Sequence, residues 1–176
     1  FGFDDNFAVG IDPLAVDYKR LFTYWQEDSN TVAAIGEKLP FDDESFDVVL
    51  SDNVIDHAEN PIGIVDEFAR VLKPKGLLYF TVNVHHPIYQ VASNLHGFWN
   101  NLGIKFELSP FADHTIHFTE EKVLEVFKRL PFDILEQKSN IENLKKNPPP
   151  NLKGFEGRLK KIFFKNALIE IIALRK

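Results

Sequence analysis

The sequence predicts an α/β protein of the doubly wound type, built on a mostly parallel sheet. Short apolar runs rich in Val, Ile, Leu and Phe alternate along the chain with segments that repeat apolar residues at helical spacing. The runs are apolar at nearly every position, which is typical of strands buried on both faces. Helices that connect parallel strands supply that cover, so alternating strand and helix patterns favour this fold class.

The first quarter of the chain predicts a strand, a helix and a second strand. Residues 7–11 form a short apolar run that ends at an Asp-Pro turn signal, and they predict a buried strand. Residues 14–25 carry apolar residues at helical spacing and predict a helix. Residues 31–35 predict the second strand, and residues 36–45 predict a loop.

The centre of the chain repeats this pattern. Residues 46–51 predict the third strand. Asn60 followed by Pro61 predicts a helix start, because Asn is a good N-cap and Pro is favoured at the first helical position. The Lys-Pro-Lys-Gly run at 73–76 ends that helix, and residues 77–82 predict the fourth strand.

The last part of the chain predicts one more helix and two strands. Thr119 is a helix cap, and the two Glu residues after it suit the helix dipole. Residues 132–136 predict the fifth strand, residues 140–161 a loop that could hold a short helix, and residues 167–174 the sixth strand. Residues 83–118 show no clear period.

Composition and charge exclude several functional classes. The chain of 176 residues has no Cys, which excludes disulfides and Cys-based metal sites and fits a reducing cytoplasm. A net charge of −6 disfavours broad binding to nucleic-acid phosphates. No apolar run reaches the roughly 18 residues that a membrane span needs. We therefore expect a cytoplasmic protein with neither a nucleic-acid partner nor a membrane span.

Ligands of open α/β sheets bind beyond the carboxyl ends of the strands. In this sequence those positions are Asp12, residues 35–37, residues 51–57 and residues 83–87. A carboxylate at the position of Asp12 can accept hydrogen bonds from both hydroxyls of a ribose, although it can equally cap the helix that follows.

Two stretches of sequence resemble one known family. The first is Gly-Glu-Lys-Leu-Pro-Phe at 36–41, followed by Ser-Phe-Asp-Val-Val at 45–49. The second is Asn-Pro at 60–61, ahead of Glu-Phe-Ala-Arg-Val-Leu-Lys-Pro-Lys-Gly at 67–76. In this order they resemble the class I S-adenosylmethionine-dependent methyltransferases, in particular the small-molecule branch with a type 11 domain. The resemblance runs from about residue 9 to residue 83.

The resemblance implies S-adenosylmethionine as cofactor, a small-molecule methyl acceptor and a role for each strand end. The sulfonium of this cofactor already activates its methyl group, so the protein mainly has to align the reacting atoms and exclude water. The implied positions are Asp12 and Pro13 for the ribose, Ile35, Gly36 and Glu37 for the adenine, and Ser51 and Asp52 for the methionine part.

Three histidines are candidate catalytic residues, as general bases for an acceptor that must lose a proton early, and Asp52 is a less favoured candidate for the same role. His57 takes the position of a family histidine, although packing or capping of the next helix is an equal alternative. His85 and His86 follow the fourth predicted strand, where they could also be surface residues. We expect residues 84–118 to form an insertion or lid on the substrate side. No set of His, Cys and acidic residues indicates a metal site.

The chain departs from the family pattern in three places. Asp56 stands where many members have a second His. Lys75 replaces the first Gly of a Pro-Gly-Gly turn, which should be tolerated if the backbone there is not left-handed. The Gly-x-Gly loop that follows the family's first strand is absent, and the chain contains no Met. We therefore expect one methyltransferase-like domain over 1–176, N-terminally incomplete by a βα unit of about 30 residues.

The family's sheet has seven strands, with the first at the centre and the last antiparallel. The six predicted strands would be its second to seventh. Without the first strand they would form two pieces with unpaired edges. We therefore expect a seven-stranded sheet whose first strand lies outside this sequence.

Two other functions fit parts of the sequence. An acidic residue after a strand also suits an NAD-dependent oxidoreductase, but residues 132–174 resemble the last two methyltransferase strands. A chain without the glycine-rich loop would also suit a methyltransferase-like binding module without activity. The methyltransferase is the leading interpretation.

Overall fold

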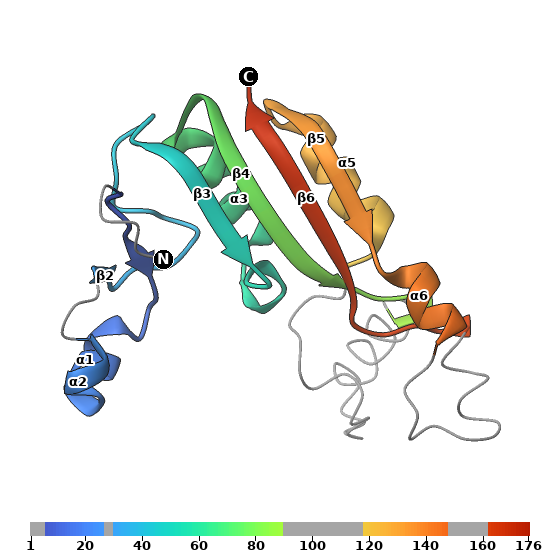
Figure 1. Ribbon diagram of the computed structural model, residues 1–176, viewed down its shortest axis with the longest axis horizontal. Helices are drawn as coiled ribbons and strands as arrows, with labels where there is room; N and C mark the ends of the chain where they lie inside the picture. The colour runs from blue at the N-terminus through green and yellow to red at the C-terminus, as the bar shows by residue number, and fades with distance from the viewer. Residues whose placement is uncertain (1–5, 27–29, 90–117, 148–161) are drawn as a thin grey trace, which may run out of the picture.

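The computed structural model describes residues 6–26, 30–89, 118–147 and 162–176, and the strands in these ranges form two sheets (Figure 1). The smaller sheet is two-stranded and has the order β1-β2, and the larger has the order β3-β4-β6-β5. An α/β fold with six strands is therefore confirmed for the described residues, and so is their division into two pieces. The single seven-stranded sheet is not present in these ranges.

The smaller sheet belongs to a strand–helix–strand unit. Its strands are parallel, with Gly10 opposite Thr31. The elements of the unit are β1 (Gly10–Ile11), α1 (Ala15–Leu21), α2 (Thr23–Gln26) and β2 (Thr31–Val32).

The prediction of one continuous helix over residues 14–25 is wrong, because the chain breaks it at Phe22. The φ of −129° and ψ of 57° at this residue are not helical. Short helices depend on packing for their stability. Here the apolar side chains of Val16, Leu21 and Tyr24 are 68%, 69% and 93% exposed. Few packing contacts are therefore available to keep residues 14–25 in one continuous helix.

The larger sheet begins with a second strand–helix–strand unit. The Asn60 side chain accepts a hydrogen bond from the N–H of Gly63 at 3.1 Å, and Pro61 is the first helical residue, so the predicted helix start is confirmed. The elements are β3 (Phe46–Asp52), the short 3₁₀ helix η1 (Ile55–His57), α3 (Pro61–Val71) and β4 (Leu72–Val84).

β4 begins earlier than predicted, at Leu72, and contains a bulge. Its pairing with β3 shifts register between Phe46 and Val48, so residues 73–76 loop out of the ladder. The helix does end before this run, as predicted. Lys75 has a φ of 66°, however, so the condition under which this residue should be tolerated, a backbone that is not left-handed, is not met.

The rest of the sheet comes from the end of the chain. The hydroxyl of Thr119 accepts the N–H of Lys122 at 3.3 Å, which confirms the predicted cap. β6 pairs antiparallel with both of its neighbours, as predicted for the last strand. The elements are α5 (Glu120–Arg129), β5 (Phe132–Ser139), α6 (Ile141–Lys146) and β6 (Ala167–Arg175).

The core lies between the four-stranded sheet and the two helices α3 and α5, which cover one of its faces (Figure 1). Phe80 of β4 and Phe127 of α5 are buried there with ring centroids 5.2 Å apart. Burial of each ring contributes about 1.5–3 kcal/mol. Val48 and Leu50, in contrast, are 49% and 51% exposed. In the described ranges helices therefore cover one face of the four-stranded sheet, because α1 and α2 lie with the smaller sheet.

Candidate functional site

Asp12 directly follows β1, at the carboxyl end of the smaller sheet. Its backbone N–H donates to the carbonyl of Val32 at 3.2 Å, and its Oδ1 accepts the N–H of Leu14 at 2.7 Å. This contact forms an Asx turn just ahead of α1, whose N-cap residue is Leu14. A carboxylate has two oxygens, so the same side chain can also accept a hydrogen bond from a ligand hydroxyl. Pro13, next to it, is exposed.

The segment after β2 brings Ile35, Gly36 and Glu37 to the start of α3. A Cβ on Gly36 would lie 3.1 Å from Cδ1 of Ile64, so the close approach favours glycine. Oε1 of Glu37 accepts the N–H of Asn60 at 3.3 Å. Ile35 is 53% exposed, which leaves an apolar surface at this strand end for a flat ring.

Ser51 and Asp52 end β3 and point to opposite faces of the sheet. Ser51 is 3% exposed, and its hydroxyl has no hydrogen-bond partner among the described residues. Asp52 is exposed on the other face, where its Oδ1 accepts the hydroxyl of Thr81 at 2.5 Å. Of the two, Asp52 is the residue whose side chain a ligand outside the core can reach.

Two residues to which the sequence assigned no role of their own, Asn53 and Thr81, fix this strand end. The N–H of Asn53 donates to the carbonyl and the hydroxyl of Thr81, at 3.1 and 3.0 Å. Its side-chain oxygen accepts the N–H of Asn83 at 2.9 Å. Asn53 has a φ of 54°, a conformation that Asn tolerates better than most residues. The Ser-Asp-Asn run after an apolar strand is the signal that could have indicated the turn.

The short helix η1 carries Asp56 and His57. Its turn is closed by the N–H of Ala58, which donates to the carbonyl of Ile55 at 3.3 Å. Asp56 is fully buried, so this departure from the family pattern faces the protein interior. The side chain of His57 lies outside the described part of the structure, and its catalytic role stays a prediction.

His85 and His86 follow β4, as the sequence predicted, and each ring accepts a hydrogen bond. Nδ1 of His85, a residue 1% exposed, accepts the N–H of Asn166 at 3.2 Å. Nδ1 of the half-buried His86 accepts the N–H of Ile88 at 3.2 Å, and its ring packs edge-on against Phe163. A ring nitrogen that accepts an N–H carries no proton. To accept a proton at Nδ1, either ring must first break this bond, and His86 is the more accessible of the two.

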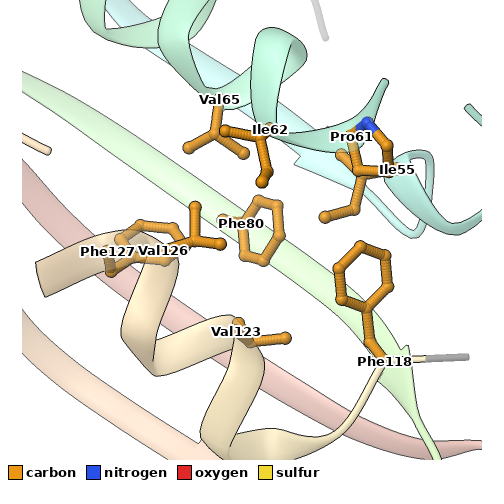
Figure 2. Close-up of a pocket in the computed structure, with 9 residues that line it drawn as sticks. All are labelled: Ile55, Pro61, Ile62, Val65, Phe80, Phe118, Val123, Val126 and Phe127. Atoms are coloured by element: carbon orange, nitrogen blue, oxygen red, sulfur yellow. The ribbon is translucent and has the colours of Figure 1, made fainter. Parts of the chain in front are cut away.

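A small apolar pocket lies between α3 and α5, and Phe80 is one of the residues that line it (Figure 2). The labelled side chains around it come from η1, α3, β4 and α5, and include Phe118 just before α5. Its volume is about 10 Å³, which is room for about one water molecule. The pocket is therefore a packing gap in the core and is too small for a nucleoside cofactor.

Most of the insertion or lid expected at 84–118 lies outside the described residue ranges, which omit residues 90–117. Within these ranges no helix combines the length and the apolar character needed to cross a membrane. Nor do the described side chains bring together three or more His, Cys, Asp or Glu residues that could hold a metal ion.

The strand ends that carry the candidate cofactor-binding residues lie in a segment that matches a known protein family. Residues 6–80 match the family model of a methyltransferase domain. The matched segment contains Asp12, residues 35–37, Ser51 and Asp52. The resemblance to class I S-adenosylmethionine-dependent methyltransferases is thereby confirmed.

Two relatives extend this comparison. An uncharacterised methyltransferase of Mycolicibacterium vanbaalenii is 36% identical over 77 residues, which are 43% of this chain and 30% of that protein. An uncharacterised protein of Methanocaldococcus jannaschii is 49% identical over 71 residues, which are 40% of this chain and 33% of that protein. The matches thus span about a third of the length of these two relatives.

A solved structure supports the fold over nearly the whole chain. A crystal structure of SAM-dependent methyltransferases from Methanosarcina mazei has a TM-score of 0.60 and 17% identity. The similarity covers 95% of this chain and 81% of that one. At this identity it shows the fold alone, which is the Rossmann-like α/β arrangement of methyltransferases.

Proposed function

We propose that the protein is an S-adenosylmethionine-dependent methyltransferase that acts on a small-molecule acceptor. The observation that carries this proposal is what the chain places after three strands, each of which belongs to a parallel pair. Asp12 follows β1 with a carboxylate, residues 35–37 follow β2 with an exposed apolar side chain, and Asp52 ends β3 with a second carboxylate. We assign these three positions to the ribose, the adenine and the methionine part of the cofactor, respectively, and an acidic residue after a strand is the group that binds a ribose in such folds. The family match supports the same reading.

In such a site the protein contributes alignment rather than activation. The cofactor supplies an electrophilic methyl group, and the chain has to hold it in line with the acceptor and keep water away. Asp12 would hold the ribose hydroxyls, Ile35 would cover the adenine, and Asp52 would lie beside the methionine part. Of the histidines whose side chains are described, His86 is the one that an acceptor could reach.

We also propose that both sheets are parts of one seven-stranded sheet, in which a further parallel strand pairs with β1 and β3. Among the described strands, β1 pairs only with β2 and β3 only with β4, so each has one open edge. On one side of the proposed strand the chain crosses over from β1 to β2, and on the other side it crosses over from β3 to β4, in the opposite direction. Because such crossovers are right-handed, they place α1 and α3 on opposite faces of the proposed sheet. A point where the strand order reverses is where α/β proteins bind ligands, and a glycine-rich loop would lie there.

Hydrogen exchange of the intact protein tests this arrangement. Amides of Phe46–Asp52 that point away from β4 should exchange slowly if another strand pairs with them. Rapid exchange at these amides, beside slow exchange at those that face β4, would contradict a continuous sheet.

Calorimetric titration with S-adenosylhomocysteine tests the function itself. Asp12→Asn keeps an oxygen that can accept the N–H of Leu14, but it removes the carboxylate charge. The variant should fold normally and bind roughly tenfold or more weakly, because hydrogen bonds to charged groups contribute about 1.5–3 kcal/mol. Asp17→Asn, at an exposed position in α1, is the matched control. The proposal would be refuted if the intact protein did not bind, or if the original protein and the two variants bound with equal affinity.

The small-molecule acceptor needs its own experiment. Labelled methyl groups from S-adenosylmethionine should pass into the small-molecule fraction of a cell extract. Label found only in protein or nucleic acid would assign the acceptor to another class.

A further inference from the structure

Arg70, in the last turn of α3, uses all five of its N–H donors on residues of the described chain. Nε and Nη2 donate to the two carboxylate oxygens of Glu67, at 2.6 and 2.8 Å. Nη1 donates to the carbonyl of Phe41 at 2.7 Å and to Oδ1 of Asp43 at 2.8 Å. Nη2 also donates to the carbonyl of Leu39 at 3.1 Å. A guanidinium holds its donors in one rigid plane, so these contacts fix the relative positions of their acceptors.

Residues 36–43, named the strap here, are held along α3 by these contacts. Glu67 also accepts the N–H of Leu39 at 2.7 Å, so both backbone groups of that residue are bound to the Glu67–Arg70 pair. The other end of the strap, at Gly36 and Glu37, lies against the first turns of the same helix. The strap contains neither a helix nor a strand, so its course depends on these contacts.

The Glu67–Arg70 pair is well placed to stay charged and rigid. The side chains of Glu67 and Arg70 are 17% and 29% exposed. The hydrogen bond from Arg70 holds the pKa of Glu67 below its ordinary value, and the same bond raises the pKa of Arg70 further. Arg129 and Glu125 of α5 form an ion pair at the same 2.6 Å, but they are 71% and 62% exposed. Exposed pairs of that kind contribute about 0–1 kcal/mol.

We propose that the Glu67–Arg70 pair is a positioning device for the adenine side of the cofactor site. This inference rests on the proposed function. The strap begins at Gly36, within the segment assigned to adenine, and the pair fixes Leu39 only a few residues later. The same helix starts shortly after β3, whose end is assigned to the methionine part. α3 therefore links the two halves of the cofactor site, and the pair attaches residues 39–43 of the strap to it.

The test compares the affinity of variants for S-adenosylhomocysteine and for adenosine, by calorimetry well below each variant's unfolding temperature. Arg70→Lys keeps the charge but cannot make five planar contacts, and Glu67→Gln removes the carboxylate. Both variants should lose about tenfold in affinity for both ligands, because small displacements of a binding segment are costly. Arg129→Lys and Glu125→Gln are the matched controls and should stay within about twofold of the original protein.

Other results would overturn the inference. Folded Arg70→Lys protein with a lower unfolding temperature but unchanged affinities would show that the pair only stabilises the fold. A loss for S-adenosylhomocysteine without a loss for adenosine would place the effect away from adenine. If Arg70→Lys does not fold, Glu67→Gln decides by the same criteria. If the original protein binds neither ligand, the proposed function fails first and this inference falls with it.

Discussion

Lys75 is the residue at which one substitution is expected to stabilise the protein. Its φ of 66° lies in the left-handed region, which costs an L-amino acid about 1–2 kcal/mol. Glycine avoids that cost but loses roughly 0.5–1 kcal/mol more in backbone entropy on folding. The difference predicts that Lys75→Gly raises the free energy of unfolding by about 0.5–1 kcal/mol.

Scanning calorimetry measures this effect directly. For a protein of this size the gain corresponds to a rise of about 1–4 °C in the unfolding temperature. Lys75→Ala is the control, because it removes the same exposed side chain but keeps the Cβ that causes the strain. Its unfolding temperature should match that of the original protein. An equal rise in both variants, or a fall with Gly, would refute the explanation from backbone strain.

Three further substitutions test other contacts. Gly76→Ala should cost about 1–3 kcal/mol in urea unfolding, because its Cβ would lie 2.8 Å from the carbonyl of Lys73; unchanged stability would mean that the bulge adapts freely. His85→Ala should cost about 2–3 kcal/mol, because it removes a buried ring and the acceptor for the N–H of Asn166; a loss of activity without a loss of stability would instead favour catalysis. Glu67→Gln should be less stable than the original protein above the ordinary carboxyl pKa of 4.5. That difference should disappear as the pH falls through the lowered pKa of Glu67, and a difference that persists in thermal unfolding at acid pH would contradict the charged pair.

Elements with local signals were predictable from the sequence. The helix starts at Pro61 and Glu120 depend on side chains that accept an N–H three residues later, so the signal and its effect lie in the same short stretch. The strand ends that carry Asp12 and Asp52 were predictable for a similar reason, because each follows an apolar run directly.

Features that depend on distant partners were not predictable. The bulge around Lys75 follows from the pairing of β4 with β3, which no local pattern specifies. The role of Thr81 depends on cross-strand contacts with Asp52 and Asn53. Arg70 belongs to a sequence motif that also contains Glu67, but three of its five hydrogen bonds go to the strap, at Leu39, Phe41 and Asp43. These three could not be assigned from the motif, because they depend on how the strap folds back along α3.

The position of β6 in the sheet has a consequence for synthesis. β6 is the last described strand in the chain, yet it lies between β4 and β5, and it is the strand with which β5 pairs. On the ribosome, β5 therefore has no neighbour from the described sheet until residues 167–175 emerge. A nascent chain that stalls before Ala167 would expose the edges of both β4 and β5, which makes this interval the one in which chaperones or aggregation would compete with folding.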